Sequence, residues 1–86
     1  MNGSYALITG ASSGIGLEIA KDLAKRGYNL ILTARRTDLL ESLSKEITDE
    51  NDIHVDFISK DLSQYEAPAE IFEFCESKNY KVDILV

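Results

Sequence analysis

Three glycines follow a short apolar run near the start of the chain, in the stretch LITGASSGIGLEIA. Apolar residues at helical spacing come after Gly10, Gly14 and Gly16, so these glycines are predicted to form the turn between a strand and a helix. The unpaired N–H groups and the dipole at the start of such a helix attract an anion. The pattern therefore predicts a phosphate-binding turn, and a glycine-rich turn that binds nothing is the alternative.

The glycines of such a turn have different tasks. Gly10 permits the tight turn, Gly14 lets the main chain approach a pyrophosphate without a Cβ in the way, and Gly16 lets the helix pack close to the sheet. Arg35 and Arg36 follow the next apolar run, about 20 residues further on, where dinucleotide-binding folds contact the adenosine ribose. Because a guanidinium suits a 2′-phosphate, the arginines favour NADP(H) over NAD(H). A solvated pair at a strand end is the alternative.

The rest of the sequence supplies the elements that would position these groups. Strand-like runs alternate with helical patterns, and the runs are Tyr5–Thr9, Asn29–Ala34, His54–Ser59 and Val82–Val86. This βαβαβαβ order predicts an α/β fold in which a parallel sheet is covered by helices on both faces. The doubly wound strand order 3-2-1-4 places the cofactor crevice between the first and fourth strands.

The three helices are predicted from their caps and apolar faces. Gly27 is expected to end the first helix, Thr37 or Asp38 to cap the second, and Pro68 to lie in the first turn of the third. Residues 48–53 read as an acidic loop. The predicted apolar faces contain Leu39, Leu40, Leu43 and Ile47 in the second helix and Ile71, Phe72, Phe74 and Cys75 in the third.

The glycine turn resembles a known nucleotide-binding signature. TGASSGIG, Thr9 to Gly16, is similar to the Thr-Gly-x-x-x-Gly-x-Gly motif of the short-chain dehydrogenase/reductase superfamily. LILTARRTDLLESL resembles the second strand and helix of that family, and KDLS, Lys60 to Ser63, resembles its acidic position after the third strand. The resemblance covers Tyr5 to Val86. It implies a Rossmann-type fold and hydride transfer between a nicotinamide cofactor and a small carbonyl or alcohol substrate.

The resemblance also implies roles for residues that spacing alone does not assign. Ser12, Ser13 and the Ile15 main chain would contact the ribose and pyrophosphate. Asp61 would accept a hydrogen bond from the adenine amino group, and the Leu62 N–H would donate to the ring; Asp61 as a plain turn residue is the alternative. The predicted cofactor site therefore contains Gly10, Ser12, Ser13, Gly14, Ile15, Gly16, Arg35, Arg36, Asp61 and Leu62.

The catalytic residues of the family have no counterpart in this sequence. The family uses a Tyr-x-x-x-Lys pair, in which the lysine lowers the tyrosine pKa so that the phenol exchanges a proton as hydride moves. No tyrosine of this chain has a lysine four positions later. We therefore expect residues 1–86 to be the N-terminal, cofactor-binding part of a longer reductase, inactive alone. A non-catalytic nucleotide-binding or assembly module, complete at 86 residues, is the alternative.

The composition of the chain indicates which binding partners and which cellular location to expect. The net charge is −6, from 15 acidic and 9 basic residues, which argues against nucleic acid or an anionic membrane surface as a partner. Cys75 is the only cysteine, and no apolar run is long enough to span a membrane, so a cytoplasmic protein is expected. His54 lacks a partner at metal-binding spacing and is predicted to be a surface residue. The apolar run Val82–Val86, at a sheet edge, predicts self-association.

Overall fold

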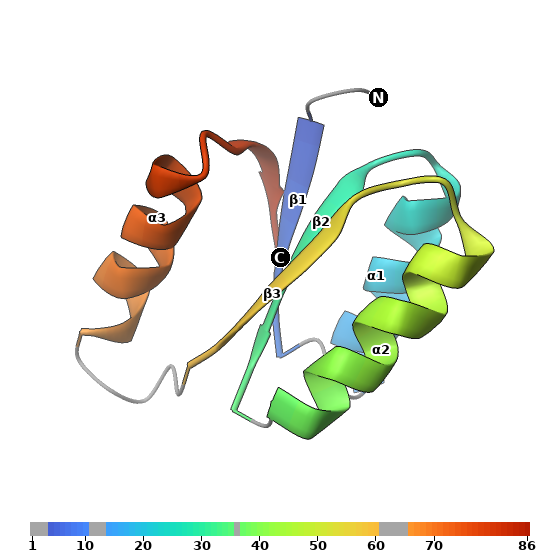
Figure 1. Ribbon diagram of the computed structural model, residues 1–86, viewed down its shortest axis with the longest axis horizontal. Coiled ribbons are helices and arrows are strands. Elements are labelled where there is room, and N and C mark those ends of the chain that lie inside the picture. The colour runs from blue at the N-terminus through green and yellow to red at the C-terminus, as the bar shows by residue number, and fades with distance from the viewer. Residues whose placement is uncertain (1–3, 11–13, 36, 61–65) are drawn as a thin grey trace.

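The computed structural model describes residues 4–10, 14–35, 37–60 and 66–86. In chain order the elements are β1 (Ser4–Thr9), α1 (Gly14–Lys25), β2 (Asn29–Ala34), α2 (Thr37–Glu50), β3 (Val55–Ser59), α3 (Ala67–Ser77) and β4 (Lys81–Leu85). The strands are all parallel and form one sheet in the order β3-β2-β1-β4, which confirms the predicted doubly wound arrangement. Helices α1 and α2 cover one face of the sheet and α3 covers the other (Figure 1).

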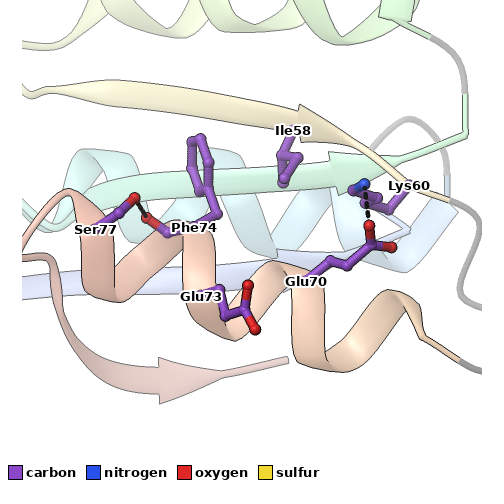
Figure 2. A pocket seen from close by; sticks show the side chains of 6 residues that line it. All are labelled: Ile58, Lys60, Glu70, Glu73, Phe74 and Ser77. Carbon is purple, nitrogen blue, oxygen red and sulfur yellow. Dashed lines mark hydrogen bonds and ion pairs between the residues drawn. The ribbon is translucent and has the colours of Figure 1, made fainter.

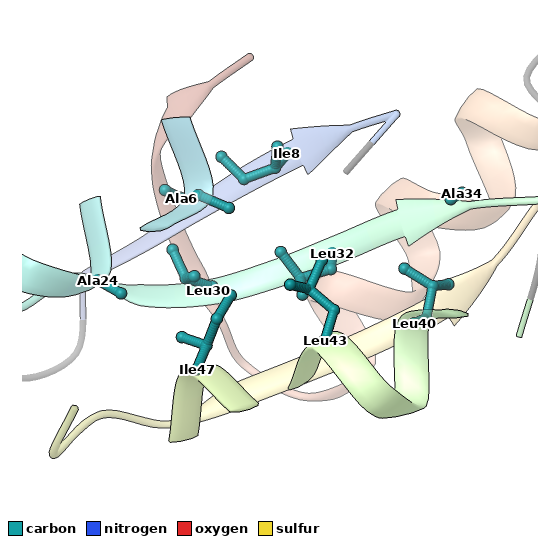
Figure 3. Packing of buried hydrophobic residues seen from close by; sticks show 10 residues of the cluster. Ala6, Ile8, Ala24, Leu30, Leu32, Ala34, Leu40, Leu43 and Ile47 are labelled. Atoms are coloured by element: carbon teal, nitrogen blue, oxygen red, sulfur yellow. The ribbon is translucent and has the colours of Figure 1, made fainter. Parts of the chain in front are cut away.

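The central strand β2 explains why the sheet needs helices on both faces. Leu30 and Leu32 point to the α1 and α2 side, whereas Ile31 points to the α3 side, and all three are fully buried. This double burial accounts for the continuous apolar run that the sequence shows here. Figure 3 shows the larger of the two cores, in which strand residues meet Ala24 of α1 and Leu40, Leu43 and Ile47 of α2.

Several predicted boundaries were wrong by a few residues. Strand β1 already begins at Ser4, β3 begins only at Val55, and β4 runs from Lys81 to Leu85. Thr37 and Asp38, the predicted caps, both lie inside α2. The helix also continues to Glu50, so residues 48–50 are helical and not a loop. It extends this far because Asn51 donates from both its main-chain N–H and its side-chain amide to the Ile47 carbonyl, each at 3.0 Å.

One leucine and one phenylalanine were predicted on the buried sides of their helices but are exposed. Leu39 is 41% exposed and Phe72 is 64% exposed, although both were predicted on apolar faces. Each lies next to a buried residue, Leu40 and Ile71 respectively, and one residue turns a helix by about 100°. The other predicted apolar residues of α2 are buried, and in α3 Ile71 and Cys75 are buried while Phe74 is partly buried.

Helices α1 and α3 end in the same hydrogen-bonded motif. Gly27 has φ +91°, its N–H donates to the Ala24 carbonyl at 3.0 Å, and the next N–H, that of Tyr28, donates to Leu23 at 3.1 Å. This is the Schellman arrangement, and it confirms Gly27 as the predicted end of α1. Asn79 takes the corresponding place after α3, with φ +60°. Asparagine tolerates the left-handed conformation better than most residues, which suits it to this position.

A tyrosine ahead of β4 connects the two edges of the sheet. The Tyr80 hydroxyl donates to Oδ2 of Asp56, on the opposite edge strand β3, at 2.6 Å, and lies 3.1 Å from Nε2 of His54. Its ring stacks on Tyr5 of β1, with ring centroids 4.2 Å apart. The pKa of Tyr80 is raised above its ordinary value. Burial is the largest cause, and the hydrogen bond to Asp56 is the next. The sequence predicted only an exposed His54, which the structure confirms.

Removing the Tyr80 hydroxyl should cost stability in a pH-dependent way. Tyr80→Phe is expected to lower the free energy of unfolding by about 1 kcal/mol at pH 7. Because the folded state raises the pKa, this contribution is present in full below the unfolded value of about 10 and is lost as the pH rises toward the raised value. Urea unfolding at pH 7 and at higher pH should therefore show that the free energies of unfolding of the wild type and of Tyr80→Phe converge as the pH rises. Tyr28→Phe, outside this network, is the control, and a constant difference at all pH values would contradict the prediction.

Candidate nucleotide-binding site

The glycine turn joins the end of β1 to the start of α1. Gly10 and Gly14 have φ values of +64° and +60°, in the left-handed region that side chains disfavour, and a Cβ added to either would meet no heavy atom within 4 Å. At Gly16, by contrast, an added Cβ would lie 2.5 Å from the Gly10 carbonyl oxygen. The first turn of α1 therefore packs directly on the main chain of Gly10, and open space remains in front of Gly10 and Gly14.

The start of α1 offers its main chain to this space. Ile15, in the first turn, is 79% exposed and is flanked by glycines on both sides. The first N–H groups of a helix have no partner within the helix and point along its axis, out of its N-terminal end. The site can therefore accept a group that carries negative charge and several hydrogen-bond acceptors, as a pyrophosphate does.

Arg35 lies at the carboxyl ends of the parallel strands, as the glycine turn does. The strands are parallel, and Thr9 at the end of β1 pairs in register with Thr33 near the end of β2. Arg35 follows β2 directly and is exposed. Its carbonyl accepts a hydrogen bond from the Ser59 hydroxyl at 2.9 Å. A cationic residue thus follows the same end of the sheet as the glycine turn.

Five predicted cofactor contacts lie outside the described residues. These are Ser12, Ser13, Arg36, Asp61 and Leu62. Their assignment remains a prediction, which rests on the family resemblance for all but Arg36 and on its place after the second strand for Arg36.

The sequence did not predict that Thr9 connects β1 to the end of β4. Its Oγ1 donates to the Val86 carbonyl at 2.7 Å, and its N–H donates to the same oxygen at 2.9 Å. The Val86 N–H in turn donates to Leu7 at 2.9 Å. These bonds hold the end of β4 beside β1, at the point where the strand order β3-β2-β1-β4 changes direction. Such a switch point is where open α/β sheets bind ligands. The threonine belongs to the quoted motif, but its spacing alone gives no indication of this partner.

A hollow of about 370 Å³ lies between α3 and the end of β3 (Figure 2). Lys60 Nζ and Glu70 Oε2, which both line it, form an ion pair at 3.2 Å, and the exposed Glu73 of α3 lines it as well. Within the described parts of the chain, no three acidic, histidine or cysteine side chains come together to hold a metal. The same residues include no helix long and apolar enough to cross a membrane.

An open parallel sheet with a glycine turn at its switch point defines the class of dinucleotide-binding α/β proteins. Residues 4–86 match the family model described as short chain dehydrogenase. The chain therefore belongs to the short-chain dehydrogenase/reductase family, of which it contains the N-terminal part.

Curated relatives are similar over most of this chain. A very-long-chain 3-oxoacyl-CoA reductase from Kluyveromyces lactis is 54% identical over 61 residues, which are 71% of this chain and 18% of that protein. A 7beta-hydroxysteroid dehydrogenase from Clostridium sardiniense is 39% identical over 71 residues, 83% of this chain and 27% of the relative. The chain thus spans less than a third of the length of either relative. These relatives are oxidoreductases.

Solved structures share this fold. L-sorbose reductase from Gluconobacter frateurii, complexed with NADPH and L-sorbose, superposes with a TM-score of 0.91 at 34% identity, over 99% of this chain and 32% of that chain. A short-chain dehydrogenase from Sphingobium yanoikuyae in complex with NADPH superposes with a TM-score of 0.84 at 35% identity, over 95% and 32% of the two chains.

Proposed function

We propose that this chain is the NADP(H)-binding part of a reductase that transfers hydride between nicotinamide and a carbonyl or alcohol substrate. The observation that carries this proposal is the packing of Gly16 on the Gly10 carbonyl, because it leaves open main chain at the start of α1. Family membership and the NADPH complexes of structural neighbours support it.

Each part of the cofactor has a proposed partner in the chain. The main chain at Gly14 and Ile15 binds the pyrophosphate, and Arg35 pairs with the 2′-phosphate of the adenosine ribose. By the family resemblance, Ser12 and Ser13 add contacts to the same phosphates and ribose, and Asp61 with Leu62 recognises adenine. Arg36 assists Arg35, because its guanidinium also suits the 2′-phosphate. The bound nicotinamide supplies the hydride chemistry.

Arg35 provides the test of the proposal. Arg35→Ala is expected to weaken NADPH binding by about tenfold, the value of a charge-assisted phosphate contact, and to leave NADH binding nearly unchanged. Isothermal titration of the 86-residue chain with both cofactors measures this difference. Arg26→Ala is the matched control, because Arg26 lies beyond the far end of α1 and pairs with Asp22 at 3.0 Å. Equal affinity of the unchanged chain for NADPH and NADH would overturn the NADP(H) assignment.

We expect the 86-residue chain by itself to show no carbonyl reduction. It contains no Tyr-x-x-x-Lys pair to exchange the substrate proton while hydride moves. The measurement is NADPH consumption with a panel of ketones and aldehydes. Consumption that increases with the concentration of a repurified chain would contradict this expectation.

A further inference from the structure

We propose that Ser59 is a positioning residue for cofactor selectivity. Its hydroxyl donates to the carbonyl oxygen of Arg35 at 2.9 Å and thereby orients the residue that distinguishes NADPH from NADH. This inference rests on the proposed function, because the orientation matters only if Arg35 contacts the 2′-phosphate.

Ser59 extends the connection between β2 and β3 by one residue. The main-chain ladder of these strands pairs Ala34 with Ser59 and ends with the Lys60 N–H donating to the Ala34 carbonyl at 3.0 Å. Arg35 lies beyond the last paired residue of β2, at a bend where the chain leaves the sheet for α2. The Ser59 side chain reaches this bend and fixes the carbonyl that follows the Arg35 Cα. The bond therefore restricts the direction in which the Arg35 side chain leaves the main chain.

The end of β3 is itself anchored, so that Ser59 can serve as a fixed point. The next residue, Lys60, extends to α3 and pairs with Glu70 at 3.2 Å (Figure 2). The Ala34 carbonyl holds the Lys60 N–H from the other side. Ser59 thus lies in a segment tied both to α3 and to β2, whereas Arg35 depends on Ser59 for the bond to its own carbonyl.

A fixed main chain at Arg35 favours one cofactor over the other. An arginine side chain loses conformational entropy when it is held against a phosphate, and a main chain that is already oriented reduces this cost. NADH has no 2′-phosphate, and the pyrophosphate common to both cofactors is assigned to the glycine turn. Loss of the Ser59 hydroxyl should therefore reduce selectivity and not binding in general.

Four variants of the 86-residue chain test this, titrated with NADPH and NADH by calorimetry. Ser59→Ala and Ser59→Val should weaken NADPH binding about threefold, within the range of a neutral hydrogen bond, with NADH binding unchanged. Ser59→Thr keeps the hydroxyl and should retain the selectivity, and Thr and Val have nearly the same shape. Ser77→Ala is the matched control, because the Ser77 hydroxyl also donates to a main-chain carbonyl at 2.9 Å, that of Phe74 in α3. It should change neither affinity.

The double variant with Ser59→Ala and Arg35→Ala shows whether Ser59 acts through Arg35. If Ser59 acts through Arg35, Ser59→Ala should have no further effect on NADPH binding in that background. A chain that prefers NADPH, but keeps this preference in Ser59→Ala and Ser59→Val, overturns the positioning role alone. An equal loss for both cofactors, or the same loss without Arg35, also overturns it. A wild-type chain without any preference for NADPH overturns the proposed function and the positioning role together.

Discussion

Gly16→Ala is expected to weaken NADPH binding by about tenfold or more and to destabilise the chain by about 1–3 kcal/mol. The added Cβ would lie 2.5 Å from the Gly10 oxygen, 3.1 Å from the Gly10 carbonyl carbon and 3.3 Å from the Thr9 oxygen. All three are main-chain atoms, so no side chain can rotate away to relieve the contact. Either α1 moves outward or the turn opens, and both displace the N–H groups assigned to the pyrophosphate. Calorimetric titration and urea unfolding measure the two effects.

The control for this prediction is the same substitution at the other end of α1. Gly27→Ala places alanine at φ +91° and should cost about 1–2 kcal/mol of stability. Since Gly27 lies at the opposite end of the helix from the glycine turn, NADPH affinity should not change. If Gly16→Ala binds NADPH like wild type, the phosphate site does not lie at this turn.

The second large effect concerns association through the β4 side of the sheet. Phe72 and Leu85 are 64% and 72% exposed, and Val82 is also exposed. The three line a hollow of about 470 Å³ together with Leu7, Cys75, Glu76 and Tyr80. Exposed apolar side chains around an apolar hollow, beside an edge strand, favour contact with another chain. We expect the 86-residue chain to self-associate at micromolar concentration, measured by light scattering coupled to size exclusion.

Leu85→Lys should shift this equilibrium to a monomer of 9.6 kDa, because it places a charge on the exposed apolar surface. Leu39→Lys is the matched control: it introduces the same charge at an exposed leucine of α2, on the other face of the sheet, and should leave association unchanged. A wild-type monomer that unfolds cooperatively would show instead that the chain is a self-sufficient domain.

The opposite edge of the sheet is less available to a partner. The Phe57 N–H on β3 is already bonded to the Asp56 side chain at 2.8 Å. A side chain that occupies an edge N–H removes a donor which a second strand would use. Strand β4 has a different irregularity, since Asp83 is the extra residue of a bulge opposite Tyr5 and Ala6. The bulge weakens strand-to-strand pairing there and leaves the apolar side chains as the main surface for association.

The sequence predicted the sheet well because its signals are local. The uninterrupted apolar run Asn29–Ala34 indicates burial on both faces. Gly27 indicates the end of a helix, because a Schellman end needs a residue with a left-handed main chain. The exposure of Leu39 and Phe72 could not be predicted, because adjacent apolar residues do not reveal which of them faces the core. The bonds from Tyr80 to Asp56 and from Ser59 to Arg35 join residues 24 apart in sequence, and no spacing rule identifies such pairs.

The Thr9–Val86 hydrogen bonds have a consequence for the order of folding. They join residues 77 positions apart, so β1 acquires its β4 neighbour only after every other described element has been synthesised. Contacts of such long sequence separation form slowly, since a large loop must close first. A central strand with one side unpaired is exposed to wrong pairing in the meantime. In the nascent chain β2 therefore pairs early with one side of β1, and the side that faces β4 stays open until β4 leaves the ribosome.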